Sequence, residues 1–371
     1  MDVKPYRYHP IRWEFLRPSD DYDDFCYAYD HNELTEAEIQ EAGGPDAIER
    51  IMECAEITWS FIEDFEKAGR HIYHLEPDLV RMFRKTSVDE VPIDLLASPY
   101  DCIFLYFGSE GKIRHPADGR VIDGAYVRLS GDVFPESEDC LLWIYLCPEF
   151  PDLTSAKSMS MPERLRLDQG YRHLVLSSEL GTVGDSYSTI FQTYDERVSE
   201  FEHYQIQKIM KQAGIIKERT TYADAKADSW VDPEGALWKG HDKEAVNLVV
   251  NALAFLTARP EDVEFDYTDD APIDLVRKAS DLRSQKQSRR AESKLEALGY
   301  RRVYTCGRRY RNAVTQEDGE SQGMHWRRGH WRNQAHGSGR EERRLIWIEP
   351  VLVNGRGETV AGRVHVTKEK Q

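Results

Sequence analysis

The densest group of residues capable of chemistry lies near the C-terminal end of the chain, at residues 325–332. This stretch, HWRRGHWR, holds two histidines, three arginines and two tryptophans. Histidine exchanges a proton near neutral pH, and arginine offers several donors to phosphate oxygens. Tryptophan presents a ring face on which unpaired bases stack. These are the parts that a metal-independent ribonuclease needs.

The ribonuclease hypothesis gives each residue of this patch a role. His325 and His330 are the candidate acid and base, and Arg328 is the candidate that stabilises the pentacoordinate phosphate. In an extended strand His330 lies on the same face as Arg328, whereas His325 lies on the other face unless Gly329 introduces a bulge. Further nucleic-acid contacts are expected from Arg327, Arg332, Trp326, Trp331 and Arg340.

Plainer interpretations of the same patch stay open. The patch either binds phosphate without cleaving it, or only packs its tryptophans between strands. A metal site built from His325, His330, His336 and Cys306 is a weaker alternative, because their spacing matches no compact zinc pattern. We therefore expect neither a metal nor a cofactor.

A second group of cations precedes the patch on a predicted helix. Arg283, Lys286, Arg290 and Lys294 fall within about 80° of one another at 100° per residue. Such a stripe fits a phosphate backbone, while an ordinary solvated helix face is the plainer interpretation.

The elements that must position these groups include several helices. Thr35 and Glu38 have capping-box spacing, which predicts a helix over 35–42, and Pro45 suits the first turn of a second helix that runs to residue 67. Apolar residues at helical spacing predict further helices at 78–84, 192–213, 244–256 and 272–298. Residues 1–33 are aromatic and acidic and are expected to be irregular.

Aromatic and β-branched runs bounded by Gly, Pro and Asp predict strands. The runs lie at 100–107, 124–129, 140–147, 172–180, 300–305, 345–353 and 360–366. Short connections between the first three favour antiparallel pairing. The predicted fold class is therefore α+β: an antiparallel sheet with several helices, plus a small basic C-terminal unit of one helix and a few strands.

Charge is divided unevenly along the chain. From residue 277 onward there are 22 Lys and Arg against 11 Asp and Glu, a balance of +11, while the whole chain carries −17 and its preceding part therefore −28. This predicts an acidic domain over 1–258, a hinge over 259–276 and a basic unit over 277–371. A basic end on an acidic chain indicates a polyanionic partner, RNA rather than DNA in this hypothesis. The acidic domain suggests a protein partner as well.

Cysteine usage and hydropathy bear on the compartment. Six cysteines form no C-x-x-C pair. They are too sparse for a disulfide scaffold, so we expect a reduced, cytoplasmic protein. The longest uncharged stretch, 245–258, is shorter than the roughly 18 residues of a membrane span, so no membrane partner is expected.

Several short motifs carry a family resemblance. They are RGHWR at 328–332, GSGR at 337–340, WIEP at 347–350 and VNG at 353–355, with the aromatic strand that follows LLASPY at 95–100. Together they resemble an uncharacterised family of bacterial and phage-associated proteins. The resemblance implies a mobile-element or defence setting, in which toxins and anti-defence factors are common, and supplies no activity.

Three function hypotheses follow. The leading one is a nucleic-acid-binding protein of a mobile-element or defence context, with metal-independent, toxin-like RNA cleavage as its enzymatic form. The alternative is an acidic protein-interaction module or anti-defence inhibitor without catalysis. A third is an enzyme that holds a small phosphorylated ligand through residues 337–340.

Overall fold

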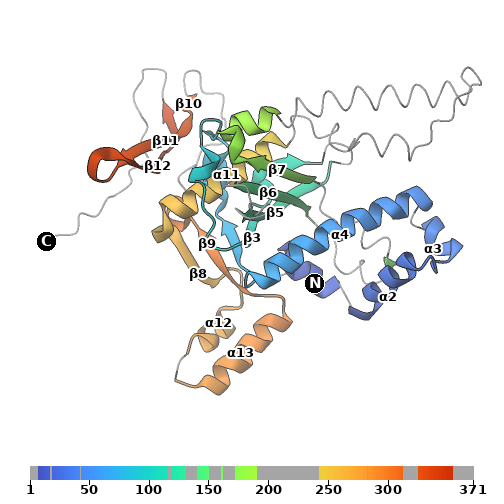
Figure 1. Ribbon diagram of the computed structural model, residues 1–371. Coiled ribbons are helices and arrows are strands. Elements are labelled where there is room, and N and C mark those ends of the chain that lie inside the picture. Colours follow the sequence, from blue (N-terminus) through green and yellow to red (C-terminus); the bar gives the residue numbers. More distant parts are fainter. Residues whose placement is uncertain are drawn as a thin grey trace, which may run out of the picture.

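A mixed β-sheet forms the centre of the protein (Figure 1). The computed structural model describes residues 7–16, 19–41, 43–115, 119–130, 140–149, 160–161, 172–189, 242–281, 283–311 and 325–353. The strand order of the sheet is β7-β6-β5-β3-β1-β9-β8, with β4 paired to β5. These strands are β1 (Ile72–Leu75), β3 (Cys102–Tyr106), β4 (Ile113–Arg114), β5 (Val121–Ser130), β6 (Leu141–Pro148), β7 (Arg172–Ser177), β8 (Val263–Tyr267) and β9 (Arg302–Cys306).

Pairing in this sheet is mostly antiparallel. Strands β3, β5, β6 and β7 pair antiparallel in series, and β8 pairs antiparallel with β9. Strand β1 is the exception, because it runs parallel to both of its neighbours, β3 and β9. The α+β class and the antiparallel sheet are therefore confirmed, and the structure adds a central strand with two parallel neighbours.

One face of the sheet is covered by the N-terminal helices. These are α1 (His9–Leu16), α2 (Ser19–Asp30) and the long α4 (Pro45–Lys67), with the short α3 (Glu36–Glu41) before α4. Phe61 and Phe65 of α4 pack with Phe104, Tyr126 and Tyr145 of the sheet in one hydrophobic cluster. The alternation of strand side chains places these aromatic rings on one face.

The opposite face is covered by α11 (Lys243–Ala258) and α5 (Pro77–Phe83) (Figure 1). Ile103, Val127 and Ile144 point to this face and are fully buried. Helix α11 is apolar on nearly all sides, as expected for a helix enclosed by other elements. Single turns of 3-10 helix lie at Ile93–Leu95, Ser109–Gly111, Ser178–Leu180, Pro260–Asp262, Arg308–Tyr310 and Ser338–Arg340.

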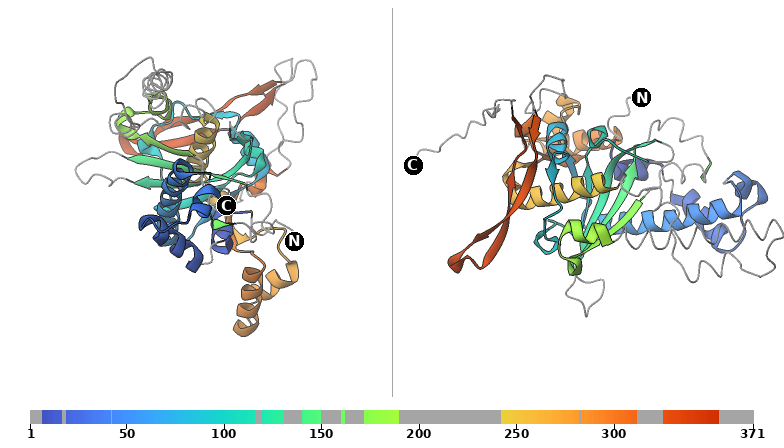
Figure 2. Two further views of the ribbon diagram at one scale, coloured as in Figure 1. Left: turned by 90° about the vertical axis from the view of Figure 1, so that its right-hand side faces the viewer. Right: turned by 90° about the horizontal axis from the view of Figure 1, so that it is seen from above.

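A β-ribbon extends from the α11 side of the body (Figure 2). Its strands are β11 (Gly329–His336) and β12 (Glu342–Ile348), and β11 also pairs with β2 (Thr86–Ser87). Beside it, β10 (His325–Arg327) pairs with β13 (Val351–Val353). Trp331 and Trp347 anchor the ribbon, because both are buried and their rings stack at 5.9 Å between centroids.

A helical hairpin projects from the body beside β8 and β9, away from the ribbon (Figure 1). It consists of α12 (Ile273–Ala279) and α13 (Gln285–Ala297), which join β8 to β9. Its small core contains Ala279, Ala291 and Leu295 and continues to Tyr267 at the base. The hairpin therefore has packing of its own besides its attachment to the sheet.

Most sequence predictions of regular elements agree with these bounds. Three differ. Residues 9–30, expected to be irregular, form α1 and α2. The helix predicted over 272–298 is two helices, since Asp281 accepts a hydrogen bond from the backbone N–H of Arg283 and favours a turn there. The strand predicted over 345–353 is interrupted at Pro350, which has no N–H to donate.

Some sequence predictions are not tested by the structure. The helix over 192–213 and the strand over 360–366 lie outside the described residues. The domain boundaries at 258 and 276 stay a prediction, although β8 and β9, which follow the first boundary, are strands of the central sheet. Within the described part of the chain, no helix has the length and apolar character needed to cross a membrane.

The attachment of the ribbon yields a stability prediction. The buried Asn251 side chain accepts a hydrogen bond from Trp331 Nε1 (2.7 Å) and donates to the carbonyl oxygens of Phe83 (3.3 Å) and Thr86 (3.2 Å). We expect Asn251→Leu to lower the free energy of unfolding by about 2–4 kcal/mol, because it leaves buried polar groups without partners. Denaturant unfolding measures this loss. The control is Asn333→Ala, at an exposed position of the ribbon. An equal loss of unfolding free energy in both variants would contradict the stabilising role of the Asn251 hydrogen bonds.

Candidate functional site

The predicted HWRRGHWR patch is divided between two small sheets. His325 and Arg327 belong to β10, whereas His330 and Arg332 belong to β11, and Arg328 lies between the two strands. Arg327, Arg328, His330 and Arg332 are exposed. The side chains of His325 and Trp326 lie outside the described part of the structure, so the catalytic assignment to His325, His330 and Arg328 stays a prediction.

Trp331 corrects one expectation. Its side chain is only 5% exposed, and its indole donates a hydrogen bond to Asn251 of α11. The ring stacks on Trp347 across the ribbon instead of facing solvent. Trp331 therefore cannot offer its face to a base in this structure, and it stabilises the ribbon.

The exposed part of the ribbon carries charges of both signs. Register places His330 opposite Ile348 and Arg332 opposite Ile346, on the face away from Trp331. Arg340 lies at the tip, followed by Glu341 and Glu342. His336 Nδ1 lies 3.1 Å from a carboxylate oxygen of Glu342. The basic side chains of the ribbon are thus interspersed with acidic ones.

The predicted basic stripe lies on the hairpin. Lys286, Arg290 and Lys294 belong to α13, and Arg283 immediately precedes that helix. All four side chains are exposed. The structure therefore separates the two predicted nucleic-acid surfaces, because the ribbon and the hairpin project from different parts of the molecule (Figures 1 and 2).

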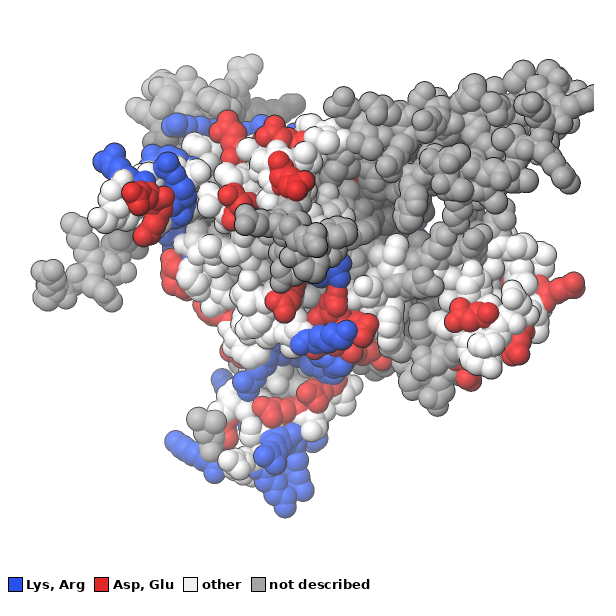
Figure 3. Space-filling view, in the orientation of Figure 1, with Lys and Arg blue, Asp and Glu red and all other residues white. Residues whose placement is uncertain are grey.

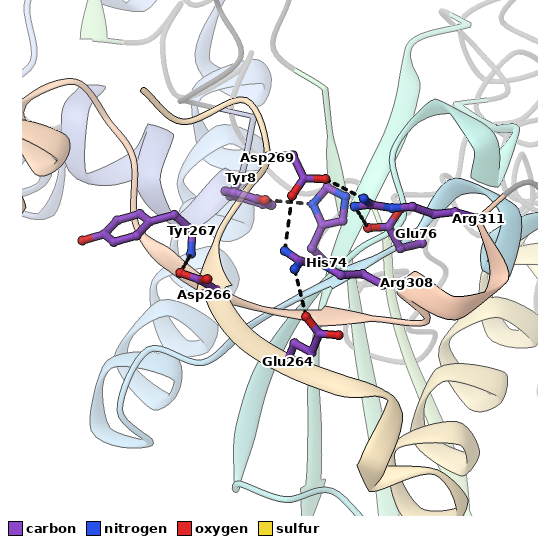
Figure 4. A network of polar contacts seen from close by, with 9 residues as sticks. All are labelled: Tyr8, His74, Glu76, Glu264, Asp266, Tyr267, Asp269, Arg308 and Arg311. Carbon is purple, nitrogen blue, oxygen red and sulfur yellow. Dashed lines mark hydrogen bonds and ion pairs between the residues drawn. The ribbon is translucent and has the colours of Figure 1, made fainter. Parts of the chain in front are cut away.

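A polar pocket that sequence reasoning missed lies on the sheet near the hairpin. Its volume is about 280 Å³. The lining side chains come from the start of the chain, from β1 and from the region around β8 and β9. They are Arg7, His74, Glu76, Thr268, Asp269, Asp270, Thr305, Arg308 and Arg311. Figure 4 draws the lining residues His74, Glu76, Asp269, Arg308 and Arg311.

Parallel pairing of β1 with β9 assembles this pocket. Register places His74 beside Thr305, so both side chains point to the same face of the sheet. Glu76 directly follows β1, and Arg308 follows β9 after Gly307. Gly307 has a φ of +82°, and a Cβ there would lie 2.6 Å from Leu79, so glycine is required at this turn.

Ion pairs line the pocket (Figure 4). Arg311 donates from Nε and an Nη to the two carboxylate oxygens of the buried Glu76, at 2.9 and 2.6 Å, and its other Nη lies 2.6 Å from Asp269. Glu76 thereby raises the pKa of Arg311 above its ordinary value. Arg308 pairs with Glu264 at 2.8 Å and approaches Asp269 at 3.5 Å. Asp269 therefore lies between two guanidinium groups.

His74 is a neutral group beside these charges. The His74 side chain is partly buried, and its Nδ1 lies 2.8 Å from the hydroxyl of the buried Tyr8. Burial lowers the pKa of His74 to about 4, and the positive charge of Arg7 acts in the same direction. Burial also raises the pKa of the Tyr8 hydroxyl. The pair is therefore uncharged at neutral pH.

Two buried polar atoms of the pocket, one in Thr305 and one in Arg308, have no hydrogen-bond partner among the described residues. Thr305 is 3% exposed, and its hydroxyl has no hydrogen bond to any described residue. The buried Nε of Arg308 likewise has no acceptor among the described residues. Since buried polar groups are nearly always hydrogen-bonded, these two suit a site that receives a polar ligand. No cluster of three His, Cys, Asp or Glu side chains with metal-site geometry occurs in the described residues.

The signals for this pocket are present in the sequence but are local and weak. Glu76 lies just before the helix predicted at 78–84, and the RRYR run at 308–311 lies within the basic unit predicted over 277–371. The strand at 72–75 was not predicted, so nothing indicated that Glu76 and Arg311 meet. The pairing of β1 with β9, which are far apart in the sequence, brings these two residues together.

Comparison with known proteins gives one family match. The model of the AcrVA2-like family, described as the anti-CRISPR type V subtype A2 family, matches residues 73–355. No curated protein sequence matches the chain. A crystal structure of AcrVA2 is similar at 16% identity, covering 76% of this chain and 72% of that chain, with a TM-score of 0.33. At that TM-score no residue correspondence follows.

The lowered pKa of the partly buried His74 predicts a pH dependence of stability. Its pKa is lowered in the folded state, so between pH 6.5 and 4 the unfolded chain binds more protons and stability falls as the pH falls. We expect His74 to contribute a loss on the order of 2 kcal/mol between pH 7 and 4.5. Asp269 and Asp270 oppose the shift, while Arg7 and Arg311 support it.

Denaturant unfolding at several pH values measures this contribution. In His74→Asn, which keeps a polar atom near the Tyr8 hydroxyl but does not titrate, the pH dependence should be flatter. His330→Asn, at an exposed position, should leave it unchanged. A curve for His74→Asn that parallels that of the parent protein would contradict a lowered pKa of His74 in the folded state.

Proposed function

Since the chain belongs to the AcrVA2-like family of anti-CRISPR type V subtype A2 proteins, we propose that it counteracts a type V CRISPR system by binding a protein component of that system. The family favours the anti-defence alternative of the sequence analysis over its leading hypothesis, and it lends no support to ribonuclease activity. RNA cleavage by His325 and His330 is therefore not part of this proposal.

The polar pocket is the binding site that we propose for the partner. The observation that carries this proposal is the Thr305 hydroxyl, which is buried at the pocket without a hydrogen bond to a described residue. A group left in this state costs free energy in the unbound protein, and a ligand that satisfies it recovers that cost. Apart from Arg7, the lining residues lie within the segment matched by the family model.

The charges of the pocket favour a protein ligand over a bare phosphate. Three arginines and three carboxylates line it, so it offers acceptors as well as donors. A phosphate group would be repelled by Glu76, Asp269 and Asp270, whereas a polypeptide segment carries groups of both kinds. A volume of about 280 Å³ holds one or two side chains of such a segment.

Phage plating tests the inhibitory function. In a strain whose type V CRISPR system targets a phage, expression of the protein should restore plating toward the level seen without targeting. The same strain with a non-targeting guide is the control, in which plating should not change. If plating on the targeting strain stays as low with the protein as without it, the proposed function is wrong.

A single substitution tests the pocket. Thr305→Val keeps the shape of the side chain but removes the hydroxyl, so it should bind the type V component about tenfold more weakly, as expected for the loss of one hydrogen bond. Its thermal stability should be equal or higher, because the hydroxyl has no partner among the described residues. Capture of type V effector complexes on the immobilised protein measures the binding.

The matched control for this substitution is Thr257→Val, an identical change at an exposed position of α11. It should leave capture unchanged. Undiminished capture by Thr305→Val would show that the partner binds outside the pocket. Restored phage plating would then still support the inhibitory function.

A further inference from the structure

The α12–α13 hairpin carries a concentration of positive charge that the proposed function does not use. Its exposed cations are Arg277, Lys278, Arg283, Lys286, Arg289, Arg290 and Lys294. We infer that the hairpin binds the phosphate backbone of a nucleic acid, through a surface separate from the polar pocket. This inference does not depend on the pocket or on its ligand.

None of these seven cations forms an ion pair with any residue that the structure describes, in contrast to the arginines of the pocket. Arg308 and Arg311 each contact carboxylates within 4 Å. On the hairpin, Asp281 is the acidic residue at the turn, and its carboxylate accepts the backbone N–H of Arg283. The positive charge of the hairpin is therefore available to an external anion.

Charge is segregated along the hairpin. Asp274 lies where α12 begins, and Glu292 and Glu296 lie in the second half of α13, where Glu292 pairs with Arg302 of β9 at 3.4 Å. Figure 3 shows basic side chains gathered at the end of the hairpin farthest from the body. Apart from Asp281 at the turn, the acidic residues of the hairpin lie toward the body. A polyanion would meet the positive end first.

The hairpin presents these cations on a packed scaffold. Ala279 of α12 packs with Ala291 and Leu295 of α13, and the Ser288 hydroxyl donates to the carbonyl oxygen of Ala279 at 2.6 Å. Lys286, Arg290 and Lys294 follow one another at intervals of four residues, which is one cation per turn and about 6 Å of rise. They occupy a different face from Ala291 and Leu295, so packing does not restrain them.

The composition of this surface favours nucleic acid over a protein partner. Protein interfaces depend on buried aromatic or apolar anchors within the patch. In the described part of the hairpin between Arg277 and Lys294, the apolar side chains Ala279 and Ala291 are both buried. Binding through lysine and arginine alone is typical of backbone contacts that do not read sequence. The surface should therefore bind RNA and DNA duplexes with little dependence on sequence.

Fluorescence anisotropy with the full chain tests this inference. The probes are a 20-base-pair RNA duplex and a DNA duplex of the same sequence, each titrated from 50 to 200 mM salt. The triple variant Lys286→Gln/Arg290→Gln/Lys294→Gln should weaken binding at least about tenfold. It should also lower the slope of log affinity against log salt by about 2 to 3, one unit for each lost phosphate contact.

A second triple variant separates local contacts from net charge. Lys67→Gln/Lys112→Gln/Lys243→Gln removes the same charge from exposed positions of the body. It should bind both duplexes within about twofold of the parent chain, because these lysines make no proposed phosphate contact. Circular dichroism and thermal melting check that both variants are folded.

Three outcomes would overturn the inference. They are no binding of either duplex at 50 mM salt, equal losses in the two triple variants, and competition by polyglutamate as effective as that by duplex at equal charge. The last outcome would assign the hairpin to an acidic protein. Thr305→Val leaves the hairpin unchanged, so it tests only whether the partner binds in the pocket. The duplex titrations test only whether the hairpin binds nucleic acid, and either proposal can therefore be rejected without the other.

Discussion

Strand β1 is hydrogen-bonded on both edges to strands that run parallel to it, and much of the molecule follows from this constraint. A parallel neighbour cannot be reached through a tight turn, so the chain leaves β1 through α5 to reach β3. It returns beside β1 as β9 only after α11, β8 and the hairpin. A strand in this position is covered on both faces, here by α4 on one side and α11 on the other.

Local signals predicted the elements that depend on local chemistry. Pro45 and the spacing of Ile48, Met52 and Ala55 are sufficient to predict α4, and the uncharged run of α11 is sufficient to predict a buried helix. Strands β1 and β8 carry no such signal, because they are short and β8 exposes Glu264, Phe265 and Asp266 at the edge of the sheet. Their places are fixed by partners that lie far away in the sequence.

The same distinction between local and long-range information applies to the candidate site. Alternation predicts that His330 shares a face with Arg328, whereas the structure places Arg328 between β10 and β11 and exposes both side chains. The alternation pattern could not show whether Trp331 is buried or exposed. A tryptophan that stacks on a base and one that packs in a core look alike in sequence. The deciding partner is Asn251, a polar residue on an otherwise apolar helix. The pocket could not be predicted from the sequence, because Glu76 and Arg311 are brought together only by the pairing of β1 with β9.

The structure shows which of the positive charges at the end of the chain are already paired with carboxylates. Counting assigns +11 to the end of the chain, yet Arg308, Arg309 and Arg311 are already paired with Glu264, Asp262 and Glu76. Their charge holds the end of β9 against β1 and β8. Among the described residues, the exposed cations without an ion pair include Arg327, Arg328, Arg332, Arg340, Arg343 and Arg344 of the ribbon region as well as those of the hairpin. The hairpin helix α13 has 13 residues and so spans about 20 Å. Since salt screens charges beyond about 8 Å, projection from the body lets this end act as a positive surface on a chain of net −17.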